Sequence, residues 1–198
     1  MNALQLFKNR RTQYALNDSL PLSNDQVEQL IREVVRESPS AFNSQSSRVV
    51  ILFGAQHVRF WNELVKEVLR PLTPEAQFAN TEQKMASFAA GAGTVLFFED
   101  QTVIRGLQEQ FPLYAEKFPE FSANSAGMAQ FAVWTALAEA GIGASLQHYN
   151  PVIDEQVQGA WDLPASWQLS AQMPFGGNAG EIGDKDYMDD SKRSRVFS

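Results

Sequence analysis

The residues best suited to chemistry are the cations at the two ends of the chain. Six of the 16 Lys and Arg residues lie there, namely Lys8, Arg10, Arg11, Lys192, Arg193 and Arg195. Guanidinium groups bind phosphate oxygens through paired hydrogen bonds, and Thr12 and Ser194 add hydroxyl donors. If the ends converge, they would form one anion site. The alternative is that basic tips are simply solvated.

A polar loop is the second candidate. The sequence SPSAFNSQ, residues 38–45, places amides and hydroxyls together ahead of an apolar run. Asn and Gln each offer a donor and an acceptor, which suits the mixed polar edge of a heterocycle. The alternative is a turn whose side chains satisfy its own backbone.

Several other kinds of site are excluded. The chain has no cysteine, which removes disulfides and a thiolate nucleophile, and its two histidines, His57 and His148, are too few for a histidine-rich metal site. The glycines at 91 and 93 precede an apolar run instead of following one, and the glycines of 173–183 have the wrong spacing for a dinucleotide fingerprint. A net charge of −7 argues against a nucleic-acid partner.

No apolar stretch approaches the ~20 residues that a membrane span needs, and no apolar run follows the first cations as in a signal peptide. We therefore expect no membrane partner and a cytoplasmic location.

Hydrophobic periodicity predicts an α+β fold, with a small mixed or antiparallel sheet flanked by helices, in a single domain over 1–198. A capping box at Ser23 and Gln26 begins one of the helices. Helices are expected over 2–11, 23–37, 57–69, 75–90, 103–110, 122–140 and 154–161. Strands are expected over 48–53, 94–98 and 167–173. Loops are expected over 14–22 and 38–47, a helix cap and turn at Gly141 and Gly143, and a glycine-rich segment over 174–183.

The order of these features resembles the flavin-dependent nitroreductase family. A leading Arg-Arg-Thr, the SPSAFNSQ loop before a strand, a glycine-rich segment after a late strand and a closing Arg-Ser-Arg occur in the family's order and spacing. The chain looks closest to a short bacterial and fungal subgroup related to fatty-acid-repression-type proteins. No single motif is specific, but the ordered set covers nearly the whole chain.

The resemblance implies FMN contacts in four segments. The phosphate and the polar edge of the flavin are contacted by Arg10, Arg11, Thr12 and Tyr14. The loop that reaches the flavin of a partner subunit contributes Ser38, Ser40, Asn43 and Gln45. The segment near flavin N5 contributes Pro174, Gly176 and Gly177. The phosphate clamp near the carboxyl terminus consists of Arg193 and Arg195.

Two departures from the family pattern concern the electronics of the flavin. The family often has a basic residue where this chain has Tyr14, which leaves the charge at the pyrimidine edge in question. Its usual Glu-Gly step is Phe175-Gly176 here, which leaves the hydrogen bond to N5 in question.

The resemblance implies a homodimeric oxidoreductase that takes electrons from NAD(P)H and passes them to nitroaromatic or quinone-like acceptors by a ping-pong mechanism. FMN supplies the redox chemistry, so no catalytic side chain is required. Two alternatives stay open: a non-catalytic, flavin-binding regulatory protein on the same scaffold, and a flavin-free protein that binds anionic partners through its basic ends.

Overall fold

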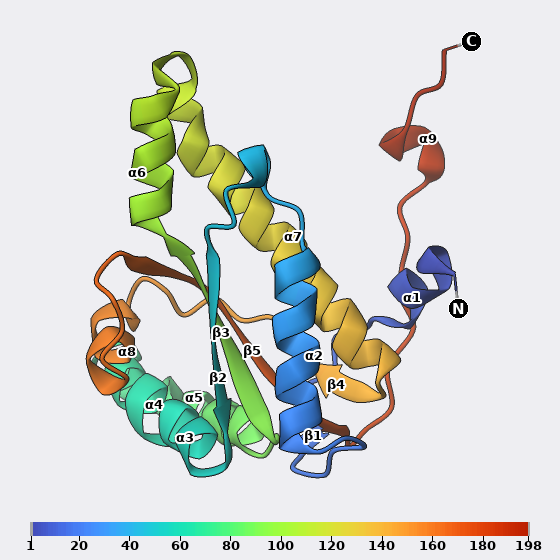
Figure 1. Cartoon of the computed structure of the whole chain (residues 1–198). Helices are drawn as coiled ribbons and strands as arrows, with labels where there is room; N and C mark the ends of the chain where they lie inside the picture. The colour runs from blue at the N-terminus through green and yellow to red at the C-terminus, as the bar shows by residue number, and fades with distance from the viewer. Residues whose placement is uncertain (1, 198) are drawn as a thin grey trace.

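The computed structural model describes residues 2–197 and has an α+β fold built on an open antiparallel sheet (Figure 1). Its strand order is β1-β5-β3-β2, and β4 also pairs with β5. The strands are β1 (Leu16–Asn17), β2 (Ser47–Phe53), β3 (Gly93–Asp100), β4 (Ile142–Ala144) and β5 (Trp167–Asn178). The expected fold class is confirmed.

Helices cover both faces of the sheet (Figure 1). Their bounds are α1 (Ala3–Asn9), α2 (Asn24–Glu37), α3 (Gly54–Arg59), α4 (Lys66–Leu69), α5 (Glu75–Ala89), α6 (Gln101–Gln110), α7 (Phe118–Glu139), α8 (Asp154–Ala160) and α9 (Asp190–Arg193). Successive residues of β3 point to opposite faces. Val95 and Phe97 therefore join the core under α2 and α7, whereas Leu96 and Phe98 join the core under α5, α8 and the helical turn Phe60–Val65.

Local sequence accounts for the predictions that are confirmed. The Ser23 hydroxyl accepts from the Gln26 backbone, and the Gln26 side chain accepts from the Ser23 backbone, so the capping box begins α2 as expected. The three predicted strands form as β2, β3 and β5, and α7 lies against both α2 and the sheet.

The end of β5 corrects the sequence-based boundaries. The expected strand stops at Met173, but β5 continues to Asn178, into the glycine-rich segment. Two short strands, β1 and β4, were also expected to be loop or turn, and both pair with this extension. Glycines that would favour a turn in isolation are instead needed where several backbones pack closely.

Several helix boundaries also differ from those expected. The expected helix over 57–69 starts at Gly54, whose φ is +53°, and contains a π-helical turn, η2 (Phe60–Val65), before α4. Phe60 and Trp61, the first two residues of this turn, are both fully buried. The α6 helix begins at Gln101 because Asp100 caps it, and α7 begins at Phe118 instead of Ser122.

Two parts of the chain project from the main body (Figure 1). One is the helical hairpin formed by α6, the 3₁₀ turn η4 (Pro112–Lys117) and the start of α7, with the short turn η1 (Ala41–Asn43) packed on α7. The other is the exposed tail after β5, which carries α9. No helix in residues 2–197 is long and apolar enough to cross a bilayer.

A buried histidine links α3 to the sheet. His57 is fully buried, and its Nδ1 lies 2.8 Å from Thr94 Oγ1. The Thr94 hydroxyl also accepts from Trp61 Nε1 at 2.8 Å, so its single proton is available to His57 Nδ1. Burial lowers the pKa of His57 to about 4, although the nearby carbonyls of Ala89, Phe88 and Gly91 act in the opposite direction.

This histidine should make stability depend on pH. The unfolded chain binds the proton near pH 6.5 and the folded chain only near pH 4, so stability is complete above 6.5 and falls as pH drops toward 4. At about 1.4 kcal/mol per unit of pKa, the loss reaches about 3 kcal/mol. The effect is measured by urea unfolding of wild type and His57→Gln between pH 7 and 4. If the free energy of unfolding fell equally with pH in both proteins, His57 would not be the source of the loss.

Candidate functional site

The first predicted segment lies against the short strand β4. Arg10 caps the end of α1, Thr12 forms a bridge with Ala144, and the Gln13 backbone N–H donates to the Ala144 carbonyl at 2.9 Å. Ala144 in turn pairs with Phe175 of β5. The structure therefore brings the Arg10–Tyr14 segment to the end of the sheet that contains Gly176.

Arg10 is the most distinctive side chain of this segment. Its guanidinium carbon lies 4.3 Å from the ring centroid of Trp134, a favourable cation–π contact. Its Nε is buried without a hydrogen-bond partner, and burial together with the charge of Arg11 lowers the pKa of Arg10. Within residues 2–197, neither arginine forms an ion pair. Two adjacent, half-buried cations that form no ion pair are suited to binding an anion.

A cavity of about 550 Å³ lies beside these arginines. Its lining is formed by Arg10, Arg11, Thr12, Gln13, Tyr14, Ala15, Glu181, Ile182, Gly183, Asp184 and Lys185. The tail is held there because Arg11 donates to the Gly183 carbonyl at 2.7 Å and Gln13 Nε2 donates to the Gly180 carbonyl at 2.8 Å. The volume falls within the roughly 300–1,000 Å³ typical of ligand pockets.

The predicted carboxyl-terminal clamp lies farther along the tail. Arg193 ends α9, and Arg195 Nη1 donates to the Ser191 carbonyl at 2.9 Å. Both arginines are exposed, and neither lines the cavity beside Arg10. In this single chain the two ends meet through Arg11 and Gly183, but the two basic clusters do not share one pocket.

Pro174, Gly176 and Gly177 are buried within β5. A Cβ on Gly176 would lie 2.3 Å from the Asn17 carbonyl oxygen and 3.1 Å from the Ala92 nitrogen. These contacts explain why glycine is needed there without any ligand, so a flavin contact by these three residues stays a prediction.

The Ser38–Gln45 loop packs on the opposite end of α7 (Figure 1). Ser38 Oγ donates to the Val34 carbonyl, and Ser40 Oγ accepts from the Gln45 backbone at 2.9 Å. These two hydroxyls therefore satisfy local backbone, as the turn interpretation expects. The exposed side-chain amides of Asn43 and Gln45, by contrast, form no hydrogen bond with another described residue.

Both ends of this loop are fixed to the body. The Ala41 N–H donates to Ser125 Oγ of α7 at 3.1 Å. The residues that follow the loop are held by the buried carboxylate of Glu99, which accepts from the hydroxyls of Ser46, Ser47 and Ser122. A rigid frame therefore presents the free amides.

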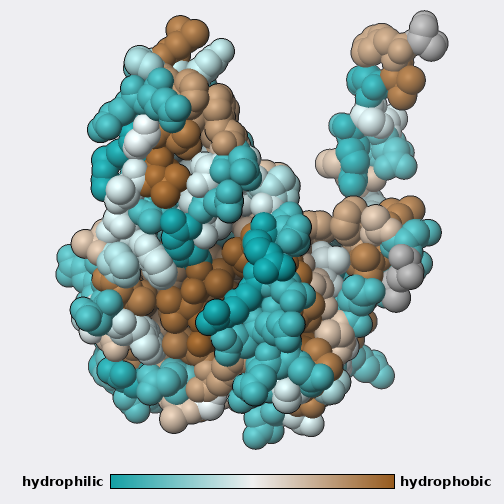
Figure 2. Space-filling model, viewed as in Figure 1, coloured by the Kyte–Doolittle hydropathy of each residue, from teal (hydrophilic) through white to brown (hydrophobic). Residues whose placement is uncertain are grey.

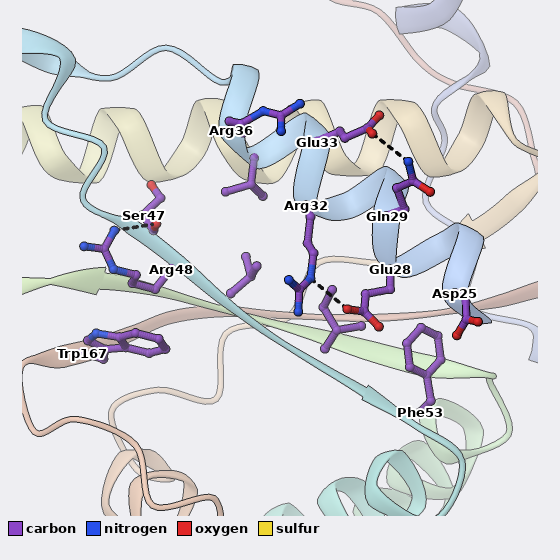
Figure 3. Close-up of a pocket in the computed structure, with 13 residues that line it drawn as sticks. Asp25, Glu28, Gln29, Arg32, Glu33, Arg36, Ser47, Arg48, Phe53 and Trp167 are labelled. Carbon is purple, nitrogen blue, oxygen red and sulfur yellow. Dashed lines mark hydrogen bonds and ion pairs between the residues drawn. The ribbon is translucent and has the colours of Figure 1, made fainter. Parts of the chain in front are cut away.

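A larger cavity, of about 1,040 Å³, lies elsewhere, between α2 and β2 (Figure 3). Charged side chains of α2 lie along one wall, including the ion pair of Arg32 with Glu28 at 2.9 Å. The other wall is apolar, with Val49, Ile51 and Phe53 of β2, and Figure 2 shows hydrophobic surface on this face. None of the predicted site residues lines this groove.

Sequence reasoning missed two residues of the site. Trp134 supports Arg10, but it stands in the apolar helix α7, where nothing distinguishes it from core. Gln13 is buried and ties the tail to the amino-terminal segment. Its only sequence signal is its position between Thr12 and Tyr14.

Comparison with known proteins places this geometry in a family. Residues 7–177 match the Nitroreductase family. The chain belongs to the nitroreductase family. The solved structure of nitroreductase CinD from Lactococcus lactis in complex with nicotinic acid superposes with a TM-score of 0.92 and 45% identity, covering 100% of both chains. CinD structures with chloramphenicol and with 4-nitrophenol superpose equally well, at TM-scores of 0.92 and 0.91.

Two further relatives extend the comparison of this nitroreductase-family chain. The Saccharomyces cerevisiae protein HBN1 is 36% identical over 181 residues, covering 90% of this chain and 89% of that protein. A structure from Exiguobacterium sibiricum in complex with FMN has a TM-score of 0.73 at 12% identity, covering 100% of this chain and 98% of the other, and shows the fold. The family and the fold support an oxidoreductase.

Proposed function

We propose that this nitroreductase-family protein is an FMN-dependent oxidoreductase, which transfers electrons from NAD(P)H to nitroaromatic or quinone-like acceptors in a ping-pong cycle. The observation that carries the proposal is the pair of half-buried arginines, Arg10 and Arg11, without a carboxylate partner in the described chain. Such a pair matches the phosphate of a flavin mononucleotide.

The residues present fit the cofactor. The partnerless Nε of Arg10 offers a buried donor, Arg11 offers a second guanidinium, and Thr12 is an exposed hydroxyl. We assign the phosphate to these three groups, with Tyr14 beside them and with Arg193 and Arg195 of the tail as further candidates. When bound, FMN accepts a hydride from NAD(P)H and passes electrons to the second substrate.

The solved relatives support the choice of ligands. CinD binds nicotinic acid, a relative of nicotinamide, and also binds the nitroaromatic compounds chloramphenicol and 4-nitrophenol. The protein from Exiguobacterium sibiricum holds FMN on the same fold. We carry these ligand classes over to this chain as part of the proposal.

A homodimer belongs to the proposal because one chain does not bring its two predicted flavin segments together. Ser125 holds the loop, and Trp134 holds Arg10. These two anchors are nine residues apart on α7. Nine residues make about two and a half turns, so these anchors lie on opposite sides of the helix and are about 14 Å apart along it. A flavin beside Arg10 would therefore meet Asn43 and Gln45 of a second copy.

Exposed apolar surface also supports a second copy. Val196 and Phe197 at the end of the tail are 88% and 92% exposed, and the groove beside β2 presents apolar side chains on an edge strand. A subunit contact would remove such surfaces from water.

The protein's own part in the reaction is binding, orientation and electrostatics. The positive charge of Arg10 and Arg11 favours the anionic cofactor, and the amides of Asn43 and Gln45 offer donors and acceptors to its polar edge. We assign no side chain as a proton donor.

An absorption spectrum of the purified protein tests the proposal. We expect flavin bands that bleach when NADPH or NADH is added without oxygen and return when 4-nitrophenol is added. Bands that neither nucleotide bleaches would favour the non-catalytic regulatory protein. A protein that is colourless and fails to take up added FMN would favour the flavin-free anion-binding protein.

A further inference from the structure

The polar loop carries an aromatic side chain that the assignment above does not use. Phe42 lies within η1 at a φ of +57°, and Asn43 and Gln45 also have positive φ, at +51° and +49°. Left-handed backbone is uncommon for residues other than glycine, and costs a bulky residue roughly 1–3 kcal/mol. Three such residues in four positions indicate a conformation that is kept for a purpose.

In this backbone conformation the Phe42 ring is exposed to solvent. The side chain is 52% exposed, although its ring centroid lies 5.0 Å from Phe111 and 5.3 Å from Phe118. Tyr114, 6.4 Å away, is 47% exposed, whereas Phe118 beneath them is buried. The cluster thus has a buried base that fixes the rings and an open aromatic surface formed by Phe42 and Tyr114.

Polar side chains lie beside this aromatic surface, as they do in ligand-binding sites. The free amides of Asn43 and Gln45 lie within three residues of Phe42 on the same loop. A flat molecule with polar substituents matches an aromatic surface edged by unpaired donors and acceptors.

We propose that Phe42, supported by Phe111 and Phe118 and extended by Tyr114, is the stacking surface that selects flat aromatic acceptors. This inference rests on the proposed function, because the loop reaches the flavin of the second copy in that arrangement. It assigns the preference for aromatic acceptors to one side chain of the loop.

Steady-state kinetics with two acceptors tests the role of Phe42. The aromatic acceptor is 4-nitrophenol, and ferricyanide is the acceptor without an aromatic ring. Loss of one stacking partner should raise the ratio of the KM for 4-nitrophenol to the KM for ferricyanide by about 10-fold. We expect this rise in Phe42→Ala and in Phe42→Leu, which keeps an apolar anchor, and a wild-type ratio in Phe42→Tyr.

Two controls separate stacking from other roles. Leu113→Ala changes a side chain that is 87% exposed and adjoins Tyr114 without joining the ring cluster, and it should leave the ratio unchanged. Size-exclusion chromatography tests whether the cluster is a subunit contact. An unchanged KM ratio in Phe42→Leu would overturn the inference. If the dimer also dissociates in this variant, Phe42 is a subunit contact instead. A wild-type protein that is colourless and takes up no added FMN would instead overturn the proposed function.

Discussion

Replacing Arg10 with alanine is expected to weaken FMN binding on the order of 100-fold, so that the purified protein is nearly colourless. Charge-assisted hydrogen bonds to a ligand contribute about 3 kcal/mol at the upper end, which corresponds to this factor. Arg10 should be near that end because its Nε is buried and partnerless and its guanidinium is held against Trp134. Flavin content after purification and FMN titration of the apoprotein measure the effect.

Matched variants make this result specific. Lys8→Ala removes an exposed cation from the same helix, and it should leave flavin content at the wild-type level. Arg193→Ala combined with Arg195→Ala tests the tail separately. Full flavin occupancy in the double variant would show that the tail arginines are misassigned, whereas full occupancy in Arg10→Ala would remove the central support for the phosphate site.

Replacing Gly176 with alanine is expected to destabilise the fold by about 3 kcal/mol or more, at or beyond the upper end of overpacking effects. The new Cβ would meet backbone atoms of Asn17, Ala92 and Gly91, and backbone cannot turn aside as a side-chain end can. The first of these contacts, at 2.3 Å, is shorter than any real Cβ contact allows. Urea unfolding measures the loss, and failure to fold is its extreme form.

Gly183→Ala is the control for this prediction. It lies in the same glycine-rich stretch, but a Cβ there meets nothing within 4 Å, so stability should change by less than about 0.5 kcal/mol. Gly176→Ala with wild-type stability but little flavin would reverse our interpretation, because glycine would then be needed for the cofactor and not for packing.

The contrast between α2 and the end of β5 shows what can be predicted from local sequence. The capping box at Ser23 and the apolar spacing behind it determine α2 within the segment itself. The segment PFGGN has the composition of a turn, yet it continues β5 because β1, β3 and β4 all pair with it. That pairing depends on residues far away in the sequence, such as Leu16, which pairs with Asn178, and local propensity does not contain it.

In the candidate site, too, some residues could be predicted from the sequence and others could not. The basic residues and the polar loop could be predicted because their side chains are unusual in an acidic chain, and the resemblance gave their roles. The residues that hold them in place could not be predicted, since Trp134 and Ser125 are ordinary residues of a buried helix. The left-handed backbone of Phe42 likewise has no glycine to signal it.

The spacing of the two anchors on α7 restricts how this protein can vary in evolution. One residue inserted between Ser125 and Trp134 would turn the second anchor by about 100° relative to the first and shift it by about 1.5 Å. Because each anchor serves a different half of the proposed site, insertions and deletions that preserve activity should fall outside these nine residues.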